Sequence, residues 1–431
     1  MKLHLIYPDW GHFPLAYRRY IQVMGPAIVA SLTPSDVEVV FTDERLRTID
    51  FRMDCDLVAI SMMTSQANRA YEIADTYREK GVPVVLGGVH VSLMPEEAAA
   101  HADAIVIGEA EHTWPDVIRD FRNGDLKRTY SCRKPADDIP LPRWSIFDRS
   151  VYLPMNSLQV SRGCPVNCEM CSVPQTYGTE FRMADTKKIL GDIGSLDSYL
   201  FLINDNLHLA KRRVRSFLDG LAETGKQWVG LAPLSIADDT AYLDHLRRTN
   251  CWAMYIDLSP WISAGLNERV SAAQVEKAHM LLERIRERNI KVIASFVFGF
   301  DHDQKDVFDR TVRFAQANGI EEAEFHILTP YPKSRLYERL DAEGRLMTRD
   351  FSRYSTSSVV YRPANMTADE LHEGYIRAWK EFYPEETHEE SKEGLVIKTF
   401  ACFPMNRTDL DHFTGAGWVD AVRRKKAGVT A

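Results

Sequence analysis

The stretch Ser161-Arg162-Gly163-Cys164-Pro165-Val166-Asn167-Cys168-Glu169-Met170-Cys171 places three cysteines within eight residues. It follows an apolar run, Leu158 to Val160, that we expect to be a strand of a parallel sheet. The loop at the carboxyl end of such a strand faces the side on which active sites form. Three thiolates at this spacing can bind three irons of a cubane [4Fe-4S] cluster, which normally takes four cysteines. One iron is then open to an added ligand.

Two other interpretations of the cysteines stay open. A structural zinc ion would need a fourth ligand from a distant Cys or His, and no second Cys or His pair follows at the usual spacing. Alternatively, the three cysteines could be buried without a ligand. The other four, Cys55, Cys132, Cys251 and Cys402, are scattered singly along the chain. A disulfide framework is therefore not expected.

The first part of the chain alternates short apolar runs with helical stretches. Expected strands are Lys2 to Tyr7, Val37 to Thr42, Leu57 to Ser61, Val84 to Leu86 and Ala104 to Ile107. Between them, segments such as Ala67 to Lys80 and Glu111 to Phe121 have helical spacing. Strands that are apolar on both sides and separated by helices favour a parallel sheet covered on both faces. We expect an α/β, Rossmann-like, doubly wound domain over residues 1–125.

A second alternation follows a proline-containing connection, residues 126–154. Its expected strands are Leu158 to Val160, Tyr199 to Ile203, Val229 to Leu231, Met254 to Leu258, Lys291 to Phe298 and Ala323 to Leu328. Six such units predict a partial (β/α)6 barrel over residues 155–350, short of the eight of a closed barrel. The remainder, residues 351–431, is expected to be a helical C-terminal extension with a tail. Thr367 and Glu370 there have the spacing of a capping box.

Composition excludes several classes of protein. The 431 residues are 45% hydrophobic and 26% charged, with a mean hydropathy of −0.29, which is typical of a globular chain. The net charge of −8 has the wrong sign for binding a nucleic-acid backbone. No run approaches the ~18 apolar residues of a membrane span, and no signal peptide is evident. We expect a cytoplasmic protein with no nucleic-acid partner.

Three loops of the N-terminal domain end expected strands and could bind a ligand. They are Ser61 to Ser65, Gly87 to His90, and Gly108-Glu109. In open α/β sheets, ligands bind at the carboxyl ends of the strands, and glycines let the backbone approach a large group closely. The alternative is that the glycines only make tight turns and that this domain is a scaffold.

The Cys-x3-Cys-x2-Cys loop closely resembles that of the radical S-adenosylmethionine (SAM) superfamily. Further stretches resemble members with an N-terminal cobalamin-binding domain, such as the bacteriochlorophyll and hopanoid methylases. These stretches are Ile60 to Ser65, Val84 to His90, Ile107 to Glu111, Ile139 to Trp144, Asn204 to Asn206, Phe298 to Asp301 and Leu328 to Pro332. The resemblance implies three cofactors: a [4Fe-4S] cluster, SAM and cobalamin.

The resemblance also implies roles for individual residues. Cys164, Cys168 and Cys171 would bind the cluster. Residues expected near SAM are Met170, Asn204, Asp205, Ser235 and Phe298. Residues expected near cobalamin are Trp10, Ser61, Thr64, Ser65, Gly87, Gly88, His90, Gly108 and Glu109. No catalytic acid or base is identified from the sequence.

The chain departs from the family pattern at several places. The Asp-x-His-x-x-Gly motif, which supplies a histidine to cobalt in many cobalamin proteins, is absent, because Asp9 and His12 have the wrong spacing. The fourth barrel strand ends in Asp257-Leu258-Ser259, where the family has Gly-x-Glu. Likewise, Tyr331-Pro332-Lys333-Ser334 stands where Leu-Pro-Gly-Thr is usual, and these two changes at strand ends indicate a divergent subgroup with an unusual substrate or altered contacts to SAM.

The function that the resemblance implies is methyl transfer from methylcobalamin to an unactivated carbon of a small molecule, by way of a 5′-deoxyadenosyl radical. An external electron donor, such as flavodoxin or ferredoxin, would reduce the cluster. One alternative is a non-methylating radical reaction, namely cyclisation, rearrangement or hydroxylation. Another is an iron–sulfur electron-transfer or sensing protein without catalysis.

Overall fold

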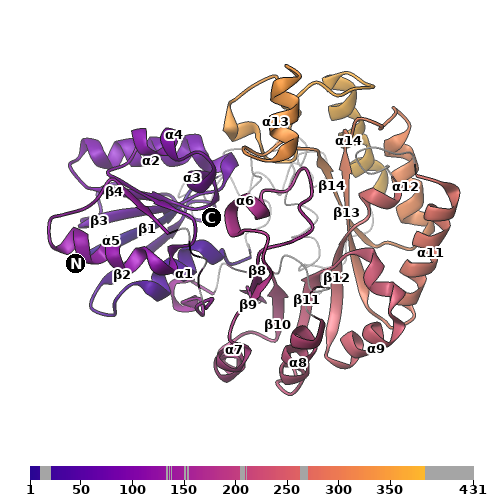
Figure 1. Cartoon of the computed structure of the whole chain (residues 1–431), viewed down its shortest axis with the longest axis horizontal. Coiled ribbons are helices and arrows are strands. Elements are labelled where there is room, and N and C mark those ends of the chain that lie inside the picture. The colour runs from indigo at the N-terminus through magenta and orange to yellow at the C-terminus, as the bar shows by residue number, and fades with distance from the viewer. Residues whose placement is uncertain are drawn as a thin grey trace, which may run out of the picture.

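The computed structural model describes residues 1–9, 21–132, 134, 136, 138–149, 152, 155–203, 209, 211–262 and 270–383. Two parallel six-stranded sheets dominate this part of the chain, one in each half (Figure 1). The predicted α/β fold class, a Rossmann-like sheet followed by a partial barrel and a C-terminal helical region, is confirmed.

The first sheet has the strand order β2-β1-β3-β4-β5-β6, with every neighbouring pair parallel. Its strands are β1 (Lys2–Tyr7), β2 (Glu38–Asp43), β3 (Leu57–Ser61), β4 (Val84–Gly87), β5 (Ala104–Ile107) and β6 (Thr129–Ser131). Its helices are α1 (Met24–Leu32), α2 (Ala67–Glu79), α3 (Val89–Leu93), α4 (Pro95–Ala100) and α5 (Trp114–Arg122). Helices α1 and α5 cover one face and α2, α3 and α4 the other, as the nearly continuous burial of the strands requires (Figure 1).

The second sheet has the order β14-β13-β12-β11-β10-β7 and remains open, with β7 and β14 at its edges. Its strands are β7 (Met155–Leu158), β10 (Tyr199–Leu202), β11 (Gln227–Leu231), β12 (Cys251–Asp257), β13 (Lys291–Phe298) and β14 (Glu322–Ile327). Its helices are α7 (Thr186–Asp192), α8 (Lys211–Ala222), α9 (Thr240–Arg248), α10 (Ser259–Ile262), α11 (Ala272–Arg286), α12 (Val307–Ala317), α13 (Arg335–Ala342) and α14 (Ala368–Phe382). An antiparallel pair, β8 (Ser161–Arg162) and β9 (Arg182–Met183), and helix α6 (Val173–Tyr177) complete this half.

Short 3-10 turns lie between these elements. They are η1 (Thr64–Gln66), η2 (Ala110–His112), η3 (Trp144–Ile146), η4 (Ile193–Ser195), η5 (Leu234–Asp238) and η6 (Phe351–Arg353). The predicted capping box is confirmed at α14, where the Thr367 hydroxyl accepts from the Glu370 amide and the Glu370 carboxylate accepts from the Thr367 amide.

Two details of the predicted organisation differ from the structure. Strand β6 falls within residues 126–154, the expected connection, and pairs with β5 as the edge strand of the first sheet. The first barrel strand is Met155–Leu158, three residues earlier than expected, because its start carries the polar Asn156 and Ser157. Both polar side chains are buried, and Asn156 Nδ2 donates to Gln22 Oε1 at 2.9 Å. A strand of this composition has no apolar run to reveal it.

The two halves pack against one another. Helix α6, next to the cysteine loop, lies beside α3 of the first domain (Figure 1). Ile21, which belongs to the N-terminal half, is 6% exposed and packs among Met155, Val229, Ala253 and Ile293 of the second sheet. This contact fills the inner face of the second sheet with a side chain from the other half, so the barrel core is completed by both halves.

Candidate functional site

The three cysteines lie in the loop between β8 and α6, close behind the first barrel strand, as predicted. Gly163, just before the first cysteine, has φ +84°, and a Cβ atom there would overlap the carbonyl oxygen of Glu180. Only glycine avoids both the strained φ and this overlap. Asn167 also has a positive φ, +51°, a conformation that asparagine tolerates better than most residues. These two positions wrap the backbone around the thiols.

The donor set of this loop fits an iron–sulfur cluster. Cys168 is exposed, while Cys164 and Cys171 are partly buried, and the amide of Val173 donates to Cys171 Sγ at 3.4 Å. Within the described ranges, no three Cys, His, Asp or Glu side chains converge as the ligands of a single metal ion would. A cubane does not require that convergence, because each thiolate binds a different iron.

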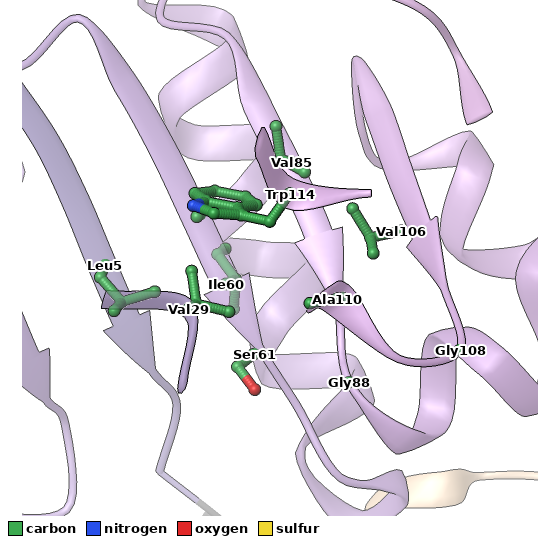
Figure 2. A pocket seen from close by; sticks show the side chains of 12 residues that line it. Leu5, Val29, Ile60, Ser61, Val85, Gly88, Val106, Gly108, Ala110 and Trp114 are labelled. Atoms are coloured by element: carbon green, nitrogen blue, oxygen red, sulfur yellow. The ribbon is translucent and has the colours of Figure 1, made fainter. Parts of the chain in front are cut away.

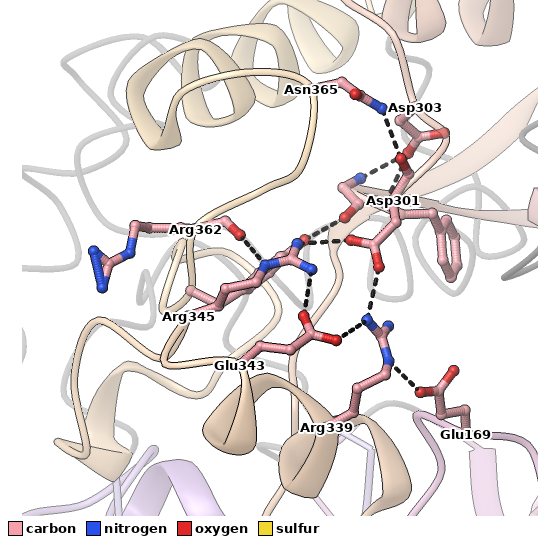
Figure 3. A network of polar contacts seen from close by, with 11 residues as sticks. Glu169, Asp301, Asp303, Arg339, Glu343, Arg345, Arg362 and Asn365 are labelled. Carbon is pink, nitrogen blue, oxygen red and sulfur yellow. Dashed lines mark hydrogen bonds and ion pairs between the residues drawn. The ribbon is translucent and has the colours of Figure 1, made fainter.

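Helix α13 holds the cysteine loop from one side (Figure 3). Arg339 Nε donates to Glu169 Oε1 at 2.8 Å, and its Nη1 donates to Asp301 Oδ2 at 2.8 Å. Arg345 donates to the other oxygen of Asp301 at 2.6 Å, and the amide of Leu336 donates to the Glu169 carbonyl at 3.0 Å. We call Glu169, Asp301, Arg339 and Arg345 the Arg339 network. It ties the residue after Cys168 to the end of β13.

A buried set of charges holds the same loop from the other side. Glu109 and Glu111 of the first domain face Arg162 and Arg182 of the β8–β9 pair, and we call these four residues the Glu109 cluster. Arg162 lies 2.8 Å from Glu109 Oε2 and 2.7 Å from Glu111 Oε1, and Arg182 lies 2.5 Å from Glu109 Oε1. The side chains of Arg162 and Glu109 are 4% and 7% exposed, so water screens this pair little.

The Glu109 cluster contains two negative and two positive charges, so its net charge is zero. Burial alone would raise the pKa of Glu109, but the hydrogen bond from Arg182 and the charge of Arg162 hold that pKa below its usual value. Arg162 also lies over the ring of Tyr177, 5.4 Å from its centroid. Glu109 is therefore a carboxylate in the folded protein at neutral pH and joins the two halves electrostatically.

A cavity lies at the carboxyl ends of the first sheet (Figure 2). Four residues expected near cobalamin line it, namely Ser61, Gly87, Gly88 and Gly108, together with apolar side chains of the strands, Val29 of α1 and Trp114 of α5. Gly88 has φ +104°, and a Cβ atom there would lie 2.5 Å from the Met62 carbonyl oxygen. Glycine therefore keeps the β3 and β4 loops in contact and leaves the cavity wall without a side chain.

The other residues expected near cobalamin lie elsewhere. His90 is fully buried, with its ring nitrogens 3.4 Å from Thr64 Oγ1 and 3.4 Å from Glu97 Oε1. Its ring packs on Phe351 of η6, on the face of the sheet away from Trp114. Ser65 is half-buried in η1 and is not among the cavity-lining residues. Glu109 belongs to the Glu109 cluster, and Trp10 lies outside the described residues.

The residues expected near SAM are also divided. Met170 lies in the cysteine loop, partly buried against the main core, and Ser235 is half-buried in η5. The Phe298 ring is 1% exposed and packs on Phe308 of α12, so its side chain points into the outer helical layer. At this position, the side chain therefore does not reach a ligand on the inner face. Asn204 and Asp205 lie outside the described residues.

Polar residues on the inner face of the second sheet were not identified as site residues from the sequence. Tyr255 Oη donates to Glu324 Oε2 at 2.5 Å, and His326 Nε2 lies 3.3 Å from the same oxygen. The signal was present in β14, where Glu324 and His326 alternate with the apolar Ala323, Phe325 and Ile327. Such alternation indicates one apolar face and one polar face.

The divergent end of β12 forms a compact unit of its own. Ser259 Oγ donates to Asp257 Oδ1 at 2.6 Å and accepts from the amide of Val297 at 2.7 Å. Burial raises the pKa of Asp257, although its hydrogen bonds from Ser259 oppose this. The two residues that depart from the family pattern thus pair with each other and join β12 to β13.

Comparisons with known proteins agree with this geometry. Residues 28–118 match the B12 binding domain family, and residues 334–389 match a domain family of unknown function, DUF4070. The chain is 30% identical over 363 residues to bacteriochlorophyllide d C-8(2)-methyltransferase of Chlorobaculum tepidum, covering 79% of this chain and 80% of that one. It is 27% identical to bacteriochlorophyllide d C-12(1)-methyltransferase of the same organism, covering 88% and 87% of the two chains.

The fold also matches a solved structure. The radical SAM methyltransferase TsrM of Kitasatospora setae, whose structure contains cobalamin and a [4Fe-4S] cluster, superposes with a TM-score of 0.64 over 99% of both chains, at 14% identity. Together, the fold and the relatives define a radical SAM enzyme with an N-terminal B12-binding domain. The chain belongs to the cobalamin-dependent radical SAM methyltransferase family that includes the bacteriochlorophyllide methyltransferases, and the predicted resemblance is confirmed.

Proposed function

We propose that this protein transfers a methyl group to an unactivated carbon of a small-molecule substrate. The observation that carries the proposal is the Glu109 cluster, which joins the loop that lines the B12-domain cavity to the loop that carries the cysteines. Gly108 lines the cavity and immediately precedes Glu109, while Arg162 precedes Gly163 and Cys164 by one and two residues. One buried ion pair therefore connects the two proposed cofactor sites.

The proposed cofactor residues follow from this geometry. Cys164, Cys168 and Cys171 would hold a [4Fe-4S] cluster, with one iron left for SAM. The main chain at Gly87, Gly88 and Gly108 would approach cobalamin without interference from side chains. When bound, these groups supply a 5′-deoxyadenosyl radical for hydrogen abstraction and a cobalt centre that carries the methyl group.

The chain itself would position the substrate and exclude water from the radical chemistry. Met170 and Ser235 remain candidates for contacts with SAM. We expect the exposed side of the cysteine loop, where Cys168 and Val166 lie, to receive electrons from a flavodoxin or ferredoxin.

None of the described helices combines the length and the apolar character that crossing a bilayer requires.

Two half-reactions test this function without knowledge of the substrate. Anaerobically reconstituted protein is incubated with hydroxocobalamin, a chemical reductant and SAM carrying a deuterated methyl group. We expect transfer of the deuterated methyl to the added cobalamin and formation of 5′-deoxyadenosine, both measured by mass spectrometry. Absence of 5′-deoxyadenosine from a protein with an intact cluster spectrum would contradict an enzymatic function.

The cysteine assignment is tested by Cys168→Ala, with Cys132→Ala as the matched control. The first variant is expected to lose the cluster absorbance and 5′-deoxyadenosine together, and the control to keep both. Formation of 5′-deoxyadenosine without methylation of cobalamin would favour the non-methylating radical reaction. A cluster spectrum that survives in Cys168→Ala would refute the cysteine assignment.

A further inference from the structure

Tyr255, Glu324 and His326 form a polar cluster on the inner face of the second sheet. Tyr255 lies on β12, and the two other residues lie on β14, with β13 between these strands. Tyr255 Oη is 2.5 Å from Glu324 Oε2 and 3.3 Å from His326 Nε2. The Glu324 side chain is 5% exposed and that of His326 is 15% exposed. The Glu324 carboxylate is therefore shielded from water.

The donors of this cluster lie beside one oxygen of Glu324, Oε2. Thr356 Oγ1 lies 3.3 Å from His326 Nδ1 and can donate to it, which leaves the proton of the ring on Nε2. Nε2 then donates to the Tyr255 hydroxyl, which in turn donates to Oε2, and Nε2 itself lies 3.3 Å from the same oxygen. The other oxygen, Oε1, is buried and has no hydrogen-bond partner among the described residues. A buried acceptor without a donor is unfavourable, and an incoming donor would remove this penalty.

The cluster faces the region below the cysteine loop. Asp257 follows Tyr255 by two residues on the same strand, and side chains two apart share a face of a sheet. The strands from β7 to β12 are parallel, so the carboxyl end of β12 lies at the same edge of the sheet as the end of β7, after which the cysteine loop follows. The inner face of β12 thus leads from Tyr255 toward the cysteines.

The backbone around His326 is held in a costly conformation. Thr356 has φ +63°, a region that β-branched residues rarely adopt, and its carbonyl accepts from the amide of Ile327 at 2.6 Å. This conformation presents the threonine hydroxyl to His326 Nδ1 and so fixes the direction of the histidine ring. The donor arrangement around Glu324 is therefore built into the fold.

We propose that Glu324 Oε1 binds an N–H group of the substrate, either an ammonium or a neutral N–H of a heterocycle. A nitrogen donor suits this position because the neighbouring donors already satisfy Oε2, and a bond to a carboxylate is stronger than one between neutral groups. This inference rests on the proposed function, since it names the substrate class of the same site. Tyr255 and His326 act as positioning residues for the carboxylate.

Isothermal titration calorimetry with matched pairs of probe molecules tests the inference. The protein is full-length, carries its cluster and is saturated with SAM before each probe is added. One pair is indole and 1-methylindole, which differ in the N–H donor, and the other is phenethylamine and phenylacetate, which differ in the N–H donor and in charge. At least one donor probe is expected to bind about tenfold more tightly than its partner. Glu324→Gln should remove that preference, while Glu321→Gln, an exposed change nearby in the chain, should keep it.

Equal binding of the two members of both pairs to the unaltered protein would overturn the inference, whether or not the Glu324→Gln variant folds. A preference that survives in Glu324→Gln would overturn it as well. The two half-reactions described above need no substrate and are measured on the same preparations. Their failure would contradict the proposed function, whereas loss of probe discrimination alone contradicts only the role of Glu324.

Discussion

The cysteine loop is held from two sides by networks of similar chemistry and very different burial. In the Glu109 cluster, Arg162 and Glu109 are 4% and 7% exposed, whereas Arg339 and Asp301 of the Arg339 network are 32% and 26% exposed. Removing one partner of a buried ion pair leaves the other charge without water, which is costly, whereas a partly exposed charge that loses its partner is rehydrated at little cost. The comparison indicates that the interface with the B12 domain fixes the loop more firmly than α13 does.

The largest effect is expected from Glu109→Gln. This change leaves Arg182 without its carboxylate partner in a buried setting, so the free energy of unfolding in urea should fall by about 3 kcal/mol. Glu111→Gln is the matched control, since among the described residues Glu111 forms an ion pair with Arg162 alone, and Arg162 keeps Glu109. An equal or larger loss in the control would show that Glu109 is not the centre of the cluster.

The dependence of the free energy of unfolding on acid pH tests the role of the Glu109 carboxylate a second way. The pKa of Glu109 is lower in the folded protein than in the unfolded chain, so its contribution is complete above the unfolded value, about 4.3, and is lost as the pH falls through the folded value. The free energy of unfolding should therefore fall more steeply below about pH 4 in the unaltered protein than in Glu109→Gln. Parallel acid profiles would contradict this role.

Arg339→Met should have a smaller effect than Glu109→Gln. Methionine keeps much of the aliphatic packing but removes the hydrogen bonds to Glu169 and Asp301. Because these partners are partly exposed, the free energy of unfolding should fall by only about 1 kcal/mol. Arg349→Met is the control, because Arg349 is 67% exposed and pairs only with Asp341 among the ion pairs of the described residues. A loss in Arg339→Met as large as that in Glu109→Gln would remove the distinction between the two networks.

The smallest expected effect is that of salt on the coupling energy of each ion pair. Raising sodium chloride from 0.1 to 1 M shortens the Debye length from about 10 Å to about 3 Å, which screens exposed pairs far more than buried ones. A double-mutant cycle on Arg339 and Asp301 should therefore lose coupling energy at high salt, while one on Arg182 and Glu109 should retain it. Equal salt dependence of the two cycles would show that both networks are hydrated.

Much of the fold could be predicted because strands such as Leu57–Ser61 and Lys291–Phe298 are apolar runs with matching bounds in the structure. The edge strand Thr129–Ser131 could not, because it has three residues, two of them exposed, and no apolar run. The cysteine loop was evident from spacing alone. Local patterns of this kind are visible in the sequence, whereas edge strands depend on their neighbours.

The partners of the site residues were not predictable in the same way. Glu109 was expected to touch cobalamin because it follows Gly108 at a strand end, but its partner Arg162 is 53 residues away in the chain. Arg339 and Glu169 are 170 residues apart. A carboxylate at a strand end has the same sequence signature whether it binds a ligand or an arginine, so only the tertiary structure distinguishes these outcomes.

The central claim is that the Glu109 cluster holds the B12-domain cavity and the cysteine loop next to each other. Electron paramagnetic resonance of the full-length protein, loaded with cob(II)alamin and a reduced cluster, tests it most directly. We expect the cobalt signal to be broadened or split by the cluster in the unaltered protein, and this coupling to weaken in Glu109→Gln while both individual spectra persist. A cobalt signal that is unaffected by reduction of the cluster, or coupling that is unchanged in Glu109→Gln, would contradict the claim.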